Sequence, residues 1–314
     1  MQTGSQRSGF LLGMVLALCA AIAAPGCRSV SRLTSASAGP PPPVVLPPTA
    51  TAEQVVAVVN QNTQRVQSYV TNNASISVPG FPNLPVASGS IAYERPLNFR
   101  FQARALTGPE VDFGSNTERF WLWAKQMTGP DGRSPLYTVR HDQYASSGAQ
   151  NMMPIDPQWI IEALGMVTIN QATMQPPLPR NDGGFEVRYL QDSPRGPLTR
   201  VLVIDSHGQV TQQSVLSPQG ALLASATASQ FRYDPQTAVS LPRVVTVQAT
   251  AADLSLKINT GDVSVNGVVG NPAVLFQPPV MQNHPVVDLG ASLGQVSQAG
   301  APPTVATPPL QQAG

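Results

Sequence analysis

The residues from Leu97 to Arg104 alternate strictly between apolar and polar side chains. The odd positions are Leu, Phe, Phe and Ala, and the even positions are Asn, Arg, Gln and Arg. Successive side chains of a β-strand point to opposite faces, so the alternation predicts a strand with one dry, aromatic face and one wet face. We expect other parts of the chain to cover the dry face.

Two neighbouring segments extend this strand into a sheet. Residues 90–93 read as a short strand, and Glu94-Arg95-Pro96 connects it to the next one. Because proline lacks an N–H and keeps the residue before it extended, Arg95-Pro96 is suited to a hairpin corner. Residues 120–124 are apolar at odd and even positions alike, which predicts a strand covered on both faces.

Two helices are predicted to supply the cover. Thr51 and Gln54 form a capping-box pattern at the start of the first helix. Four valines then fall on one helical stripe: Val55, Val59, Val66 and Val70. Asp156-Pro157 predicts the start of the second helix, with an aspartate N-cap and a proline in the first turn. An amphipathic helix that covers a sheet needs no function of its own.

The second half of the chain reads as one strand after another. Residues 185–189 and 254–259 alternate between apolar and polar side chains. The sequence Asp-Ser-His-Gly at 205–208 predicts a hairpin turn between strands at 199–204 and 209–216. Because connections this short join antiparallel strands, we expect an antiparallel sheet.

One string of residues resembles a known family. Gly89, Arg95-Pro96 and Phe99, followed by an aromatic strand, a polar turn and a strand with tryptophan, resemble the lipoprotein carrier/receptor fold (LolA/LolB type). With the two helices in order, the resemblance covers roughly residues 51–289. It implies an α+β fold, in which a curved antiparallel half-barrel is covered by an N-terminal helix and a central helix.

The resemblance also implies a ligand. Proteins of this family hold acyl chains in an apolar cavity between the sheet and the helices. On this chain we expect the cavity to be lined by a set of aromatic and aliphatic side chains: Val55, Val59, Phe99, Phe101, Phe120, Trp121, Leu122 and Trp123.

Arg95 has two interpretations. In the resembled carriers the arginine of the Arg-Pro motif lies in the cavity and holds the lid closed over the empty protein. A guanidinium has five donors and can satisfy several carbonyls at a helix end. The alternative is a solvated arginine at a hairpin corner.

Residues 1–26 have the features of a lipoprotein signal peptide. An apolar run at 10–24, too short to span a bilayer comfortably, ends at Ala24-Pro25-Gly26-Cys27. This ending resembles the bacterial lipobox, in which the cysteine receives a diacylglycerol. The other cysteine, Cys19, lies inside the apolar run, so we interpret Cys27 as a lipid attachment site and not as half of a disulfide. A plain secretory signal cleaved nearby is the alternative.

Low-complexity segments flank the predicted lipid-binding domain at 51–289. Residues 27–50 are rich in Ser, Ala and Pro, which predicts a lipidated N-terminus followed by an extended tether that reaches on the order of 60 Å at most. Residues 290–314 are rich in Ala, Gln, Pro and Gly and show no periodicity. We expect this tail to be disordered.

Composition and motifs argue against several classes of function. Of the 314 residues 11% are charged, and the formal net charge is +1. A net charge this small creates no electrostatic field that would attract nucleic acid. The sequence contains no nucleophile elbow, phosphate loop or dinucleotide fingerprint. His141, His207 and His284 are not spaced as metal ligands. We expect no enzyme activity, no metal and no cofactor.

The sequence therefore suggests a lipid-anchored protein of the bacterial cell envelope, held at the outer membrane through Cys27 and facing the periplasm. Arg28, which follows this cysteine, is compatible with sorting to that membrane in the resembled family. The expected ligands are acyl chains of lipids or lipoproteins, bound for transfer or reception, and a periplasmic carrier protein is a candidate partner. The alternative is a structural or sensory interaction module whose sheet is filled by its own side chains.

Overall fold

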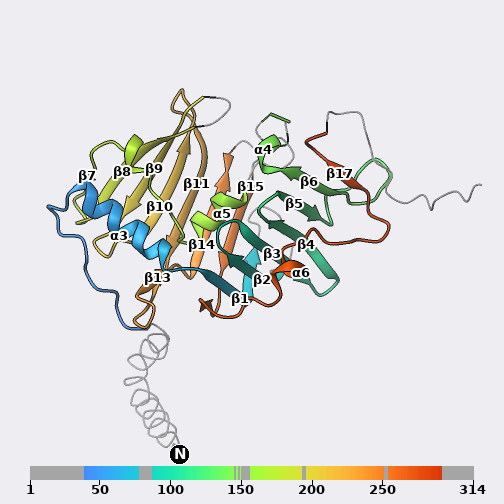
Figure 1. Ribbon diagram of the computed structural model, residues 1–314, viewed down its shortest axis with the longest axis horizontal. Helices are drawn as coiled ribbons and strands as arrows, with labels where there is room; N and C mark the ends of the chain where they lie inside the picture. The colour runs from blue at the N-terminus through green and yellow to red at the C-terminus, as the bar shows by residue number, and fades with distance from the viewer. Residues whose placement is uncertain are drawn as a thin grey trace, which may run out of the picture. The chain divides into compact units, whose positions relative to one another are not determined.

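Within the residues that the structure describes, one large β-sheet, a separate two-stranded sheet and a few short helices make up the fold (Figure 1). The computed structural model describes residues 39–77, 87–144, 146–147, 149, 156–192, 196–250 and 254–291. The described residues from Pro42 onward belong to one compact unit. The predicted signal peptide, Cys27 and most of the predicted tail lie outside the described residues.

The elements follow one another along the chain as a helix, six strands, a helical region and a second run of strands. The helices are α3 (Ala52–Gln64), α4 (His141–Tyr144), α5 (Pro157–Ala163), the 3-10 turn η2 (Gln171–Thr173) and α6 (Pro272–Leu275). The strands of the first half are β1 (Ser68–Ser77), β2 (Ala87–Glu94), β3 (Asn98–Ala105), β4 (Gly108–Ser115), β5 (Arg119–Ala124) and β6 (Leu136–Arg140). Those of the second half are β7 (Leu178–Pro179), β8 (Phe185–Gln191), β9 (Leu198–Ile204), β10 (Val210–Leu216), β11 (Leu222–Ser229), β12 (Arg232–Asp234), β13 (Val239–Leu241), β14 (Val244–Ala249), β15 (Leu254–Asn259), β16 (Ser264–Val265) and β17 (Val286–Asp288).

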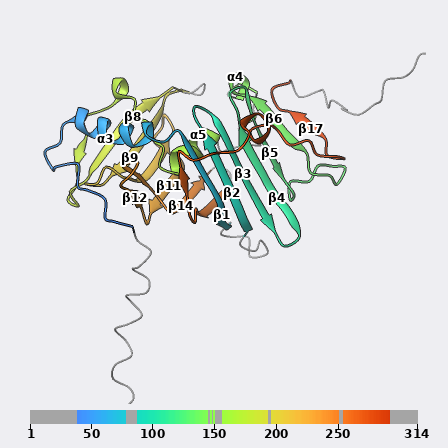
Figure 2. The same cartoon turned by 60° about the horizontal axis from the view of Figure 1, so that its bottom comes forward.

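Among the described residues the large sheet has 15 strands, in the order β17-β6-β5-β4-β3-β2-β1-β15-β14-β11-β10-β9-β8-β7, with β16 paired to β1, and β12 and β13 form a separate pair. Figure 2 shows β1 to β6 as neighbours in chain order. The pairs are antiparallel, apart from β17 and β6, which are parallel. Because the order ends at β17 on one side and at β7 on the other, the sheet is open. The predicted antiparallel sheet is confirmed.

Helix α3 begins where the capping box predicts. The Gln54 N–H donates to Thr51 Oγ1 at 3.3 Å, and the Thr51 N–H donates to Gln54 Oε1 at 2.9 Å. The expectation that the helical stripe continues to Val70 is wrong, because α3 ends at Gln64. The cause is non-local: the backbone of residues 68–71 pairs with residues 91–94 of β2 and becomes the start of β1.

Helix α5 matches the prediction from Asp156-Pro157. The Gln158 N–H donates to Asp156 Oδ1 at 2.8 Å, and Pro157 occupies the first turn. Trp159, Ile160 and Ala163 are buried. The helix packs against β11 and β14 in the middle of the sheet (Figure 1).

The last part of the predicted tether is part of the folded unit. The N–H groups of Val45 and Leu46 donate to the Ser206 carbonyl at 3.0 Å, in the turn between β9 and β10. Leu46 is 1% exposed and packs with Val55 and Phe185. A leucine in this otherwise proline-rich stretch therefore fixes the chain just before α3.

Candidate functional site

The strand registers place the apolar side chains on one face of the sheet, which we call the inner face. One aligned row crosses β6 to β1: Tyr137, Leu122, Phe113, Phe101, Ile91 and Thr71. A second row crosses β15 to β8: Leu256, Val247, Ala226, Gln213, Leu202 and Val187. Pairing of Ile76 with Ile258 joins the two halves into one surface.

Four of the predicted lining residues come together on this face. Phe99, Phe101 and Phe120 are buried in the cluster that includes α5, and Leu122 packs against its edge half-buried. The rings of Phe99 and Phe113 meet edge to face, with centroids 6.0 Å apart. The alternation at 97–104 therefore predicted both the strand and its buried face correctly.

Trp121 and Trp123 lie on the opposite face of β5, so an inner-face cavity would not include them. Successive side chains of a strand alternate, and Phe120 and Leu122 already take the inner positions. The two tryptophans pack with Leu136 and Met281 instead. Both faces of β5 are covered, as the apolar pattern of this strand predicted.

A buried polar network accompanies Trp121 on this outer face. The Trp121 Nε1–H donates to Asp112 Oδ1 at 3.0 Å, and Arg100 forms an ion pair with Asp112 at 2.7 Å. Arg100 also donates to the Leu275 carbonyl at 2.8 Å, which ties the sheet to the segment around α6. Arg100, a polar residue of the alternating strand, thus binds the C-terminal segment around α6.

Val55 and Val59 are buried, but in a different cluster from Phe99. Helix α3 lies across the β8–β10 end of the inner face, where both valines pack with Val187 and Leu202 (Figure 1). The predicted lining set is therefore divided between α5 and α3, with the two tryptophans outside it.

Arg95 connects the β2–β3 corner to the end of α3. Its Nε–H donates to the Val66 carbonyl at 2.8 Å, and its Nη2 donates to the Thr63 carbonyl at 2.7 Å. The Val66 carbonyl lies just beyond the end of α3, and the Thr63 carbonyl also accepts from the Val66 N–H at 3.1 Å, so the guanidinium adds a second donor at Thr63. Arg95 is half-buried. The structure therefore gives Arg95 a helix-end contact and not only solvent.

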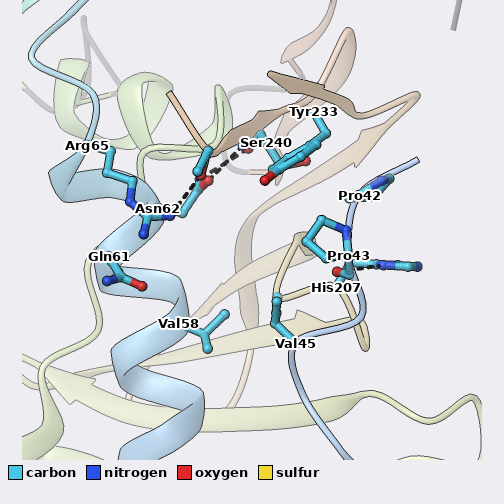
Figure 3. A pocket seen from close by; sticks show the side chains of 12 residues that line it. Pro42, Pro43, Val45, Val58, Gln61, Asn62, Arg65, His207, Tyr233 and Ser240 are labelled. Carbon is cyan, nitrogen blue, oxygen red and sulfur yellow. Dashed lines mark hydrogen bonds between the residues drawn. The ribbon is translucent and has the colours of Figure 1, made fainter. Parts of the chain in front are cut away.

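The polar stretch that follows the valines of α3 fixes the helix from its other sides. Asn62 donates to the Ser240 carbonyl at 3.1 Å and accepts from its N–H at 2.8 Å (Figure 3). Asn60 makes the same two-way contact with the backbone of Ile169, at 3.1 and 2.8 Å. These amides bind backbone groups far away in sequence, a role that the sequence alone did not indicate.

A small pocket lies beside this part of α3 (Figure 3). Its lining includes Pro42, Val58, Arg65, His207 and Tyr233, and its volume is about 100 Å³. That volume is well below the roughly 300–1,000 Å³ of pockets that hold drug-sized ligands, so it is too small for a long acyl chain. His207 Nδ1 lies 3.1 Å from the Pro43 carbonyl, which assigns this histidine to the attachment of the N-terminal segment.

A charged network on the inner face was missed by the sequence analysis. Arg200 of β9 forms a buried ion pair with Glu162 of α5, and Gln213 Nε2 donates to the Glu162 carbonyl at 2.8 Å. Burial raises the pKa of neighbouring Tyr189 to about 12, against the smaller opposing effect of Arg200. The available signal was the phase of β9, since Arg200 occupies the same face as Leu202 and Ile204.

The remaining histidines also bind backbone groups. His141 Nε2 lies 2.8 Å from the Asn116 carbonyl, and His284 Nδ1 lies 2.7 Å from the Ser134 carbonyl. Within the described ranges, no group of three or more His, Cys, Asp or Glu residues is placed to hold a metal. None of the described helices is both long and apolar enough to cross a membrane.

No protein-family model and no curated protein matches the sequence. Solved structures do match. An outer membrane lipoprotein-sorting protein domain from Vibrio parahaemolyticus is 12% identical with a TM-score of 0.49, over 72% of this chain and 100% of that one. A LolA superfamily protein from Nitrosomonas europaea is 10% identical with a TM-score of 0.43, over 73% and 98%. A DUF1329 family protein from Desulfovibrio piger is 9% identical with a TM-score of 0.46, over 71% and 96%.

The chain is thus similar to LolA superfamily structures, in agreement with the resemblance noted in its sequence. At identities and TM-scores this low, the likeness carries no information about function.

Proposed function

We propose that this chain binds the acyl chains of lipids or lipoproteins on the inner face of its sheet. The observation that supports the proposal is the course of the apolar row across β3 to β6. Phe101 and Phe113 are buried, whereas Leu122 and Tyr137 next to them on the same face are only half-buried. The apolar row thus extends beyond the fully buried part of the inner face. An acyl chain can make its first contact at these half-buried residues.

The nature of the cover also supports binding. On this face the large sheet meets two short helices, of 13 and 7 residues, and the small two-stranded sheet of β12 and β13, whose Val239 and Leu241 are buried in the same cluster as Phe99. Displacing a short helix exposes apolar surface that an acyl chain then covers, at about 25 cal/mol for each Å² removed from water. In this account Arg95 holds α3 in place while the protein is empty.

The proposal includes an anchor and a location. Cys27 would carry the lipid, and residues 28–41 would connect it to a lipid-binding domain that begins at Pro42 and ends near residue 289. The sheet would act as a curved half-barrel under α3 and α5. The protein would face the periplasm at the outer membrane and exchange acylated ligands with a carrier protein, without making or breaking a covalent bond.

Leu122→Glu tests the binding face. A carboxylate at this half-buried position opposes entry of an acyl chain but does not fill the fully buried core. We expect uptake of a fluorescent fatty acid to fall at least about tenfold, and Leu106→Glu, at a fully exposed turn position, to leave it unchanged. Uptake by Leu122→Glu equal to that of the parent would contradict the assignment, provided that circular dichroism shows the variant folded.

The interaction-module alternative has an observation in its favour. Phe99, Phe120 and Val139 are at most 1% exposed, so part of the inner face is filled by the protein's own side chains. If this packing is permanent, the protein binds no hydrophobic dye and its sheet serves only as a scaffold. Dye binding to the folded protein separates the two functions.

A further inference from the structure

Arg200 places a positive charge on the mainly apolar inner face. It shares the inner face of β9 with Leu202 and Ile204 and is 3% exposed. It lies directly opposite Tyr189 of β8 in the strand register. A cation at this depth costs free energy unless other groups compensate for its lost hydration.

The contacts of Arg200 are incomplete. Its Nη1 donates to Gln191 Oε1 at 3.0 Å, and its Nη2 contacts the Glu162 carboxylate and Gln213 Oε1, the latter at 3.3 Å. The Nε–H is buried and has no hydrogen-bond partner in the part of the chain that the structure describes. The edge formed by Nε and Nη2, which normally binds a carboxylate through two parallel hydrogen bonds, is therefore only half used.

Of the three side chains that contact Arg200, only Glu162 carries a formal negative charge. Glu162 is on α5, whereas Arg200, Gln191 and Gln213 are on the sheet. Buried ion pairs contribute little net stability compared with apolar residues of the same size. The Arg200–Glu162 pair, however, joins the sheet to α5. If α5 moves away with Glu162, Arg200 is left on the sheet as a strong binding site for another anion.

We propose that Arg200 binds the anionic headgroup, a carboxylate or a phosphate, of the acylated ligand after that group has replaced Glu162. The inference rests on the proposed function, because it assumes that the acyl chain occupies the inner face. It specifies the ligand further, since a neutral amphiphile would leave Arg200 buried and unpaired. The planar guanidinium fork suits both oxyanions.

The test compares ligands that share a chain and differ in the headgroup. The full chain carrying Cys27→Ser, which removes the predicted lipidation site, is titrated with laurate, dodecyl phosphate and dodecanol at neutral pH. We expect at least one anionic ligand to bind about tenfold or more tightly than the alcohol. The ratio of laurate to dodecyl phosphate then shows which headgroup the site prefers.

Three variants assign the preference to this site. Arg200→Gln should abolish the preference for the anion and retain binding of the alcohol. Glu162→Gln should strengthen binding of the anion several-fold, since it removes the competing carboxylate, and it remains informative if Arg200→Gln fails to fold. Arg188→Gln is the matched control, because Arg188 is an exposed arginine on the adjacent strand, and it should leave the preference intact.

Equal affinity of the Cys27→Ser protein for anions and alcohol would overturn this inference and leave the proposed function standing. An unchanged preference in Arg200→Gln would overturn it as well. If none of the three ligands binds, the proposed function falls and the headgroup site falls with it.

Discussion

At the scale of single residues, Arg95 connects the β2–β3 corner to the end of α3. Its two hydrogen bonds end on carbonyls of Thr63 and Val66, at the point where α3 gives way to β1. The side chain is half-buried, so water can replace part of what a substitution removes. In the proposed function, this contact holds α3 in place while the protein is empty and breaks when a ligand enters.

We predict that Arg95→Ala lowers the free energy of unfolding by about 1–2 kcal/mol and increases the fluorescence of a bound hydrophobic dye. Both carbonyls lose the guanidinium as a donor, while Thr63 keeps the Val66 N–H, and the end of α3 separates more often from the sheet. Urea unfolding and dye titration measure the two effects. The control is Arg104→Ala, which removes an exposed arginine from the adjoining strand β3.

A loss of stability without any gain in dye binding would show that Arg95 is only a structural cap of α3. If Arg95→Ala and Arg104→Ala gave the same results in both measurements, Arg95 would have no role in holding α3 against the sheet.

At the scale of elements, local sequence patterns decide the conformation of some segments and non-local contacts decide that of others. The alternation at 97–104, the capping box at Thr51 and the cap at Asp156 are complete within a few residues. Each of them predicted its element correctly, because the interactions that decide the conformation are themselves local.

The errors have a different origin. The valine stripe was extended to Val70 because helical spacing continues there, but pairing of residues 68–71 with β2 decides their conformation. Trp121 and Trp123 were placed in the cavity because residue type does not show which face of a doubly covered strand is inner. The partnership of Arg200 with Glu162 joins residues 38 positions apart, and no local rule relates them.

The segment before α3 gives an element-scale prediction. Leu46→Ala should lower the free energy of unfolding by about 2–4 kcal/mol, because Leu46 is 1% exposed in the cluster beneath α3. Val44→Ala is the matched control: Val44 is two residues away and 67% exposed, and its substitution should change stability by less than about 0.5 kcal/mol. Denaturant unfolding of both variants provides the comparison.

Equal, small effects of the two substitutions would contradict the attachment of residues 42–50 to the domain. The tether would then extend to residue 50, as its proline content alone suggested.

At the scale of the whole molecule, buried tyrosines connect stability to pH. Burial raises the pKa of Tyr69, Tyr93 and Tyr189 above the ordinary value of 10.0. The folded state therefore holds these protons more tightly than the unfolded state does. The resulting stabilisation is complete below about pH 10 and is lost as the pH rises from there through the folded-state values.

We predict that the urea midpoint falls steeply above about pH 10 and that Tyr69→Phe loses less stability over the same interval. Tyrosinate absorbance should appear together with unfolding. Ionisation of all tyrosines near pH 10 with the fold intact would show that these side chains are not buried as the structure has them.

The central claim concerns the whole molecule as well: that the inner face accepts acyl chains. Native mass spectrometry of the full chain carrying Cys27→Ser, purified from bacterial cells without detergent, tests it most directly. We expect a population of protein with an added mass equal to a lipid or an acylated peptide, and a higher bound fraction after fatty acid is added. A bare protein mass in both samples would contradict the claim and favour a sheet filled permanently by its own side chains.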